Sequence, residues 1–367
     1  MNKKISTQQF AFLLFFLLQG SSLFYIPEAG AGRDAWIANI LASLLGFYVL
    51  FAFLGIHNKF PGISVLRVSE LALGKAAGKT LNLLFVCVIF TVALRYLHNQ
   101  VIILNIIYRG IPDILFQSVL ILAAACCIYK GLINIARLAE LFIWVSVFLF
   151  FLSFIIAYNL MDPMNLTPVL ADVKPVIAGA FYAFAWPYAE LSLLAVFLPF
   201  ISDLGEKKRF IYYWYFLAAI ILLFKTVESI AILGPEMLMA ARVPFYEIHR
   251  LIDFADFLRR VELFFFFPLL IMGFIASLLA YKSFLLGLKE LFSLKQFRPL
   301  ILPVGLLIII LTNYIFPSDL EYLQEAEKTL PLLTVPFYLF YPSIILLTSR
   351  IREKHIRKQL NSRSFNT

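Results

Sequence analysis

Long uninterrupted runs of apolar residues constrain this chain more than any other feature. Hydrophobic residues make up 62% of its 367 residues and charged residues 14%, whereas a soluble domain has roughly 45–50% and about 25%. A water-soluble core of this length could not bury that excess. The runs are about 18–25 residues long, which is the length that an α-helix needs to cross a bilayer. Because they lack the short alternating pattern of barrel strands, an all-α integral membrane protein is expected.

The hydropathy pattern predicts ten transmembrane helices and no soluble domain. Most of the 31 Lys and Arg residues fall in alternate connecting segments, so both termini are expected in the cytoplasm. The net charge is +9, but the basic residues flank apolar runs and form no soluble patch. The lipid bilayer is therefore an expected partner and nucleic acid is not. The predicted spans are residues 6–30, 35–56, 80–107, 114–130, 133–157, 175–200, 210–234, 260–288, 299–316 and 330–348.

Two of these spans are predicted to be broken. The first contains Gly20-Ser21-Ser22 followed by Pro27, and the sixth contains Trp186-Pro187-Tyr188. Gly and Ser weaken a helix, and Pro removes a backbone donor. The simpler alternative is that each kink serves helix packing alone.

The broken spans open two halves of five spans each. Because five is odd, the second half begins on the opposite side of the membrane, which is typical of an inverted repeat whose broken helices meet near the midplane. The predicted fold is therefore a 5+5 inverted repeat with broken helices 1 and 6. The first repeat is expected at residues 1–159, the second at 160–348, and a basic cytoplasmic tail at 349–367.

Ionisable residues within the spans are the sharper functional signal, because charge inside a membrane is costly and faces a cavity or a partner. Lys225 and Glu228 are three residues apart on one helix and are predicted to neutralise each other. Glu190 has no such neighbour and lies beside the second break. It is expected to act at the ligand site, or to pair across helices with Arg95 or Lys225.

Motifs of catalytic and cofactor sites are missing from the sequence. It has no Gly-rich phosphate loop, no His-Glu-x-x-His, no Gly-x-Ser-x-Gly and no cysteine pair at metal spacing. Neither an enzyme activity nor a cofactor or metal is expected.

A small polar ligand is expected where the two helices break. Backbone N–H groups of Ser21, Ser22 and Leu23 would begin the second half of the first span and, with the helix dipole, favour a carboxylate. Carbonyl groups near Phe184 and Ala185 would favour an ammonium group. The alternative for each aromatic residue is a plain core position. The candidate ligand-binding residues are Gly20, Ser21, Ser22, Tyr25, Tyr96, Gln100, Phe184, Trp186, Tyr188, Glu190, Leu191, Ser277 and Tyr281.

Several sequence segments resemble one known family. AGRDAWIA (31–38), GLINIARLAEL (131–141) and NLTPVLADVKPVIAGA (165–180) resemble the spore germination permeases, which are the B subunits of spore germinant receptors. So do FPGISVLRVSELALGKAAGK (60–79) and VPFYEIHRLIDFADFLRRVE (243–262), and the resemblance covers about residues 5–350. The chain departs from the family where FFFFP (264–268) replaces an expected Trp, and this concerns the shape of the eighth span.

This resemblance implies both a fold and a function. The family is similar to the amino acid–polyamine–organocation transporters, which have the LeuT-type fold. It implies a nutrient-sensing subunit in the spore inner membrane, with an amino acid as the expected germinant and with receptor A and C subunits as partners. Two alternatives stay open: a secondary amino acid transporter coupled to protons or sodium, and a scaffold with a vestigial pocket.

Overall fold

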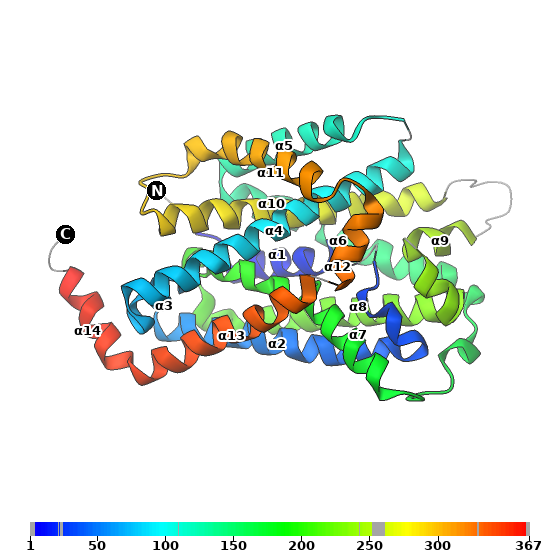
Figure 1. Cartoon of the computed structure of the whole chain (residues 1–367), viewed down its shortest axis with the longest axis horizontal. Coiled ribbons are helices and arrows are strands. Elements are labelled where there is room, and N and C mark those ends of the chain that lie inside the picture. The colour runs from blue at the N-terminus through cyan, green and yellow to red at the C-terminus, as the bar shows by residue number, and fades with distance from the viewer. Residues whose placement is uncertain are drawn as a thin grey trace.

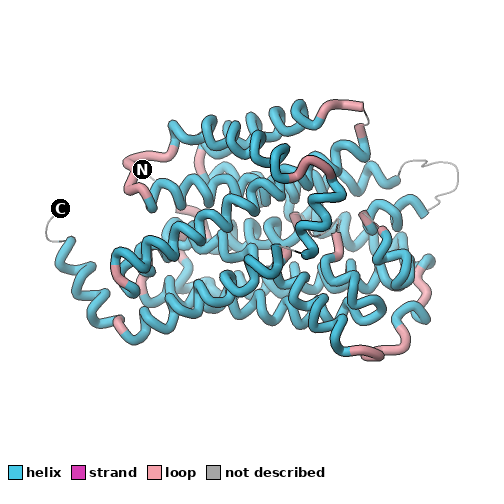
Figure 2. The backbone as a smooth tube through the Cα atoms, in the orientation of Figure 1, coloured by secondary structure: helices cyan, strands magenta, loops and turns pink. Residues whose placement is uncertain are grey.

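The computed structural model describes residues 4–20, 22, 25–108, 110–241, 243–251, 261–328 and 330–364, and this part of the chain is almost entirely helical (Figure 2). Helices α3 and α14 lie together at one end of the bundle and α9 lies at the other (Figure 1). The elements are α1 (Thr7–Gln19), η1 (Pro27–Asp34), α2 (Ala35–Lys59), α3 (Val65–Leu73), α4 (Lys75–Ile107), α5 (Asp113–Lys130), α6 (Leu132–Ala157), η2 (Tyr158–Leu160), η3 (Pro163–Leu166), α7 (Val173–Ala185), η4 (Tyr188–Phe200), α8 (Leu204–Ala240), α9 (Pro244–Leu251), α10 (Val261–Leu291), η5 (Arg298–Leu300), α11 (Ile301–Ile315), α12 (Asp319–Lys328), α13 (Leu330–Ile351) and α14 (Glu353–Ser364).

Within the described residues, eight helical segments are long and apolar enough to cross a membrane. They correspond to eight of the ten predicted spans. The first predicted span is represented by the shorter apolar helix α1, and the last by α13. The fold is thus the expected all-α membrane architecture, and a count of ten crossings is compatible with it. The division at residue 159 falls within η2 and stays a prediction.

The first predicted break is present, but its second half differs from the prediction. Helix α1 begins with a capping box, in which Ser6 Oγ accepts from Gln9 N at 3.1 Å, and it ends at Gln19. Helical structure resumes at Pro27, as the 3₁₀ segment η1 that runs directly into α2. Proline suits the first position of a helical segment because its missing N–H would have no partner there. The second half therefore starts at residue 27 instead of residue 21.

The second predicted break is confirmed at its predicted place. Helix α7 ends at Ala185, Trp186 adopts an extended conformation, and η4 begins at Tyr188. Pro187 has no N–H to continue the helical ladder, which explains why α7 stops here.

The two broken segments run antiparallel beside each other. At one end, Ile5 N donates to Phe200 O at 2.9 Å and Ser202 N donates to Ile5 O at 3.0 Å. At the other end, a Cβ on Gly179 of α7 would lie 3.0 Å from Ala31 Cβ of η1. The start of α1 thus meets the end of η4, and η1 meets α7. This is the arrangement that an inverted repeat requires of its two broken helices.

Gly20, which directly follows α1, packs closely on α10. A Cβ at Gly20 would lie 2.8 Å from Met272 O and would also contact Ala276 Cβ. Because one neighbour is a backbone atom within a helix, it cannot move aside as a side chain would.

We expect Gly20→Ala to lower the thermal unfolding temperature of the detergent-solubilised protein, because overpacking of this kind costs about 1–3 kcal/mol. Gly205→Ala is the matched control, since its Cβ would meet no atom within 4 Å. Equal melting temperatures for the two variants would contradict the close approach of α1 and α10.

Helix α9 is attached to the bundle through a buried histidine. It lies between α8 and α10 and is not among the segments able to cross a membrane. His249 Nδ1–H donates to Phe245 O at 2.6 Å, so its Nε2 is left to accept from Ser153 Oγ of α6, also at 2.6 Å. Burial lowers the pKa of His249 from 6.5 to about 4, because the charged ring would lose its hydration.

Attachment of α9 is expected to weaken as the pH falls from 6.5 towards 4. In that window the detached ring takes up a proton and the buried ring does not, so the attached state loses on the order of 2 kcal/mol by pH 5. Hydrogen exchange of α9 amides measures this, and His249→Gln removes the pH dependence. Identical protection at pH 7 and pH 5 in the unmodified protein would show that the ring is not buried in its neutral form.

Candidate functional site

A buried ion pair joins the second broken helix to α4. Arg95 Nη2 donates to Glu190 Oε1, and the two side chains are 3% and 1% exposed. Tyr96 donates its hydroxyl to the other carboxylate oxygen, Glu190 Oε2. Glu190 lies in the first turn of η4, directly after the break. Of the two predicted partners for Glu190, Arg95 is therefore the correct one.

Aromatic rings cover this ion pair. The Arg95 guanidinium lies over the Trp186 ring at 5.7 Å from its centroid. Tyr25, in the unwound segment of the first break, stacks on the Trp186 ring with a centroid distance of 5.3 Å and an interplanar angle of 26°. Tyr322 of α12 meets Trp186 edge-on at 6.3 Å. The two breaks are thus in direct contact through Tyr25 and Trp186.

The Arg95 guanidinium has donor capacity left over. Its Nε and Nη1 are buried and have no hydrogen-bond partner in the described part of the protein, and neither has the buried hydroxyl of Tyr338 from α13. A guanidinium carries five N–H donors in a planar fork that fits a carboxylate. Buried donors without partners are costly, especially in lipid. Arg95, Glu190, Tyr96, Trp186 and Tyr338 are here called the Arg95 cluster, in which Arg95 and Tyr338 keep buried donors without partners in the described residues.

The break in α1 holds an internal cation. Lys225 Nζ, on α8, donates to the backbone carbonyls of Ser22 and Tyr25, the latter at 3.1 Å. The predicted pairing of Lys225 with Glu228 is therefore wrong, because free carbonyls at the break are nearer to the ammonium group. Ser22 donates its hydroxyl back to Leu18 O. The Lys225 ammonium group is thus the hydrogen-bond partner of two backbone carbonyls in the break, a contact that the sequence analysis did not predict.

A buried carboxylate in η1 was missed by the sequence analysis. Glu28 is 1% exposed, and its Oε1 accepts from Asn39 Nδ2 and from Thr226 Oγ1, each at 2.7 Å. Tyr188 donates its hydroxyl to Asn39 Oδ1 at 2.9 Å. An acidic residue directly after Pro27, inside a predicted span, is the signal that could have revealed it. Tyr188, a predicted ligand residue, thus belongs to this network on the α2 side.

Three predicted residues line a separate small cavity. Gln100 of α4 and Ser277 and Tyr281 of α10 border a space of about 10 Å³, enough for about one water molecule. Both polar atoms of Gln100 are buried without a partner in the described residues, while Ser277 Oγ donates to Gly273 O at 2.9 Å. The structure therefore brings these three residues together between α4 and α10, and the Arg95 cluster shares only α4 with them.

The remaining candidate residues have other surroundings. Phe184 and Leu191 are fully buried in the hydrophobic core, and Gly20 packs on α10. Ser21 and Leu23, two of the three predicted N–H donors, lie outside the described residues. No group of three His, Cys, Asp or Glu side chains suited to a metal ion occurs in the part of the chain that the structure describes.

Comparisons with known proteins agree with this architecture. The profile of the Spore germination protein family matches residues 4–320. Spore germination protein KB of Bacillus subtilis is 27% identical over 361 residues, covering 97% of each chain. The putative spore germination protein YfkT of the same organism is 23% identical over 322 residues, covering 86% of this chain and 87% of its own.

Two solved structures have a similar fold. The crystal structure of MhsT in complex with L-phenylalanine superposes with a TM-score of 0.66 at 15% identity, covering 94% of this chain and 89% of MhsT. A manganese transporter of Eremococcus coleocola superposes with a TM-score of 0.51 at 14% identity, covering 92% of this chain and 76% of that one. At these identities the likeness concerns the fold alone, which is of the LeuT type.

The buried ion pair makes a testable stability prediction. Glu190→Leu leaves the Arg95 charge buried and unpaired, which is expected to cost about 3–5 kcal/mol and to reduce the amount of folded protein in membranes. The double variant Arg95→Met/Glu190→Leu removes both charges and should recover most of that loss. Fluorescence-detected size-exclusion chromatography measures the folded fraction; additive losses in the double variant would mean that the two side chains do not interact.

Proposed function

This chain belongs to the family of spore germination proteins, and we propose that it is the membrane subunit of a spore germinant receptor that binds a small nutrient, an amino acid, and triggers germination. The observation that carries the proposal is the Arg95 cluster. It places unpartnered guanidinium donors beside the break in the second broken helix. The apolar helices and the family together indicate a multi-pass protein of the spore inner membrane.

The chemistry of the cluster fits an α-amino acid. The free N–H groups of Arg95 and the hydroxyl of Tyr338 would take the carboxylate. Helix α7 ends at Ala185, and because the last carbonyl groups of a helix have no partner within it, they favour the ammonium group. Trp186 and Tyr25 would supply an apolar wall against the side chain. This assigns the carboxylate to Arg95 instead of the first break, where helical structure resumes at Pro27, which has no N–H to donate.

Sensing requires that the nutrient bind two conformations with unequal affinity. The Arg95–Glu190 pair could differ between two such conformations, because it joins α4 to η4. The guanidinium that pairs with Glu190 is also the group that would hold the ligand. A change at the Arg95 cluster would then be passed to the A and C subunits of the receptor, the partners proposed from the family.

A secondary amino acid transporter is the second candidate, and two observations favour it. The fold is shared with a transporter, and the name of the MhsT structure records bound L-phenylalanine. Glu190 would be the protonation site. Uptake of labelled amino acid into liposomes, with a pH dependence that Glu190→Gln alters, distinguishes transport from sensing.

We expect Arg95→Lys to raise the nutrient concentration for half-maximal germination at least tenfold. Lysine keeps the charge that Glu190 needs but loses the planar fork that would hold a carboxylate. The measurement is a panel of single amino acids on spores that carry the variant as the only copy of this protein.

Arg137→Lys is the matched control, because Arg137 lies exposed on α6. Immunoblots of spore membranes must show equal amounts of both variants. A normal nutrient response with Arg95→Lys would remove the Arg95 cluster as the ligand site, and the scaffold alternative would then be favoured.

A further inference from the structure

A basic cavity lies at the end of the bundle where α3 and α14 meet, far from the Arg95 cluster. Its volume is about 430 Å³. Four Lys and Arg side chains line it: Arg67 of α3, Lys75 and Lys79 of α4, and Arg352 at the junction of α13 and α14. The one acidic lining residue, Glu70, is paired with Arg67 at 2.9 Å. The cavity therefore has an excess of positive charge and suits an anion.

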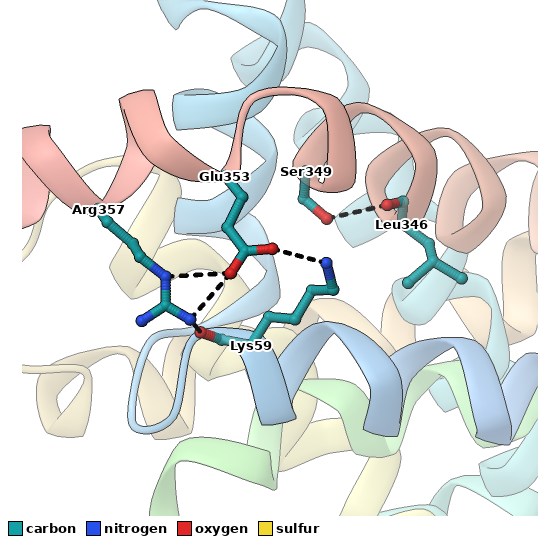
Figure 3. A network of polar contacts seen from close by, with 5 residues as sticks. All are labelled: Lys59, Leu346, Ser349, Glu353 and Arg357. Carbon is teal, nitrogen blue, oxygen red and sulfur yellow. Dashed lines mark hydrogen bonds and ion pairs between the residues drawn. The ribbon is translucent and has the colours of Figure 1, made fainter.

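Helix α14, which contributes to the lining of this cavity, is attached to α2 by an ion pair. Glu353 accepts from Lys59 Nζ at 2.8 Å and from Arg357 Nη2 at 2.9 Å (Figure 3). These bonds, that from Lys59 first, lower the pKa of Glu353 because they stabilise its carboxylate. Arg352 Nη1 donates to Ala72 O of α3 at 3.1 Å. These contacts join Arg352 and α14 to α3 and α2.

An apolar groove adjoins the basic cavity. It has a volume of about 590 Å³ and shares Lys75, Lys79 and Leu291 with the cavity. Its other large side chains are Leu83 and Phe292, which are 47% and 63% exposed. Lys75 and Lys79 are one helical turn apart and stand between the two spaces.

This combination identifies the chemistry of the ligand. The excess of lysine and arginine excludes a divalent cation. A free phosphate ion has no apolar part that could fill the groove. A phospholipid has both parts, a phosphate and an acyl chain. By the distribution of Lys and Arg along the sequence, this end of the bundle is expected on the cytoplasmic side, where anionic lipids attract basic residues near the surface.

We propose that an anionic phospholipid binds here, with its phosphate among Lys75, Lys79 and Arg352 and an acyl chain along Leu83 and Phe292. The lipid joins α4, α10 and α14, three elements that are distant in the sequence.

The test uses the full-length protein in detergent, titrated with phosphatidylglycerol or phosphatidylcholine and followed by native mass spectrometry. Phosphatidylglycerol is expected to bind tightly and phosphatidylcholine weakly. The double variant Lys75→Gln/Lys79→Gln should weaken phosphatidylglycerol binding by about tenfold or more, since each basic residue near an anionic lipid contributes on the order of a fivefold effect. Lys130→Gln, an exposed lysine on α5, is the control and should bind like the unmodified protein.

A second variant separates the lipid from a free anion. Phe292→Ser removes the apolar wall only, so it should weaken phosphatidylglycerol binding and leave the effect of inorganic phosphate on the melting temperature unchanged. Equal stabilisation by inorganic phosphate and phosphatidylglycerol would overturn the proposal in favour of a soluble anion site. Equal binding of the two lipids, or an equal loss with Lys130→Gln, would overturn it as well.

Discussion

The ion pair between Arg95 and Glu190 is the interaction on which the centre of this protein depends. Both side chains are buried at the level where a helix breaks, and a charge there is stable only with a partner. Because Arg95 belongs to α4 and Glu190 to η4, the pair joins an element of the first half of the chain to the broken helix of the second half. Tyr96 and Trp186 then hold the carboxylate and the guanidinium in fixed orientations.

The two helix breaks are electrostatically different, although the fold makes them equivalent. At the first, the ammonium group of Lys225 donates to carbonyl groups of the unwound segment, so the protein supplies its own cation. At the second, Glu190 is neutralised by Arg95, which keeps spare donors. A zwitterionic ligand would therefore orient its carboxylate by Arg95, and the first break would contribute mainly the stacked ring of Tyr25.

The architecture could be predicted from the sequence, because the length of apolar runs and the positions of Gly20 and Pro187 are local properties. The partners of buried charges could not. Spacing along one helix favoured Lys225 with Glu228, but the carbonyl groups that Lys225 contacts lie about 200 residues away in sequence and are brought near only by packing. Tyr188 and Glu190 are two residues apart, so they face different sides of the segment, towards α2 and α4 respectively.

Helices α4 and α10 both run from the centre of the protein to the basic cavity. Helix α4 carries Arg95 near its middle and begins at Lys75, which lines the basic cavity. Helix α10 carries Ser277, which lines the small cavity, and ends at Leu291, which lines the basic cavity. The distance along α4 from Lys75 to Arg95 is about 30 Å at 1.5 Å per residue. If α4 moves as one rigid body, a displacement at Arg95 also displaces Lys75. A nutrient that alters the Arg95–Glu190 contact would thus shift the lysines under α14, and a lipid that binds one position of α4 more tightly would change the affinity for the nutrient by the same factor.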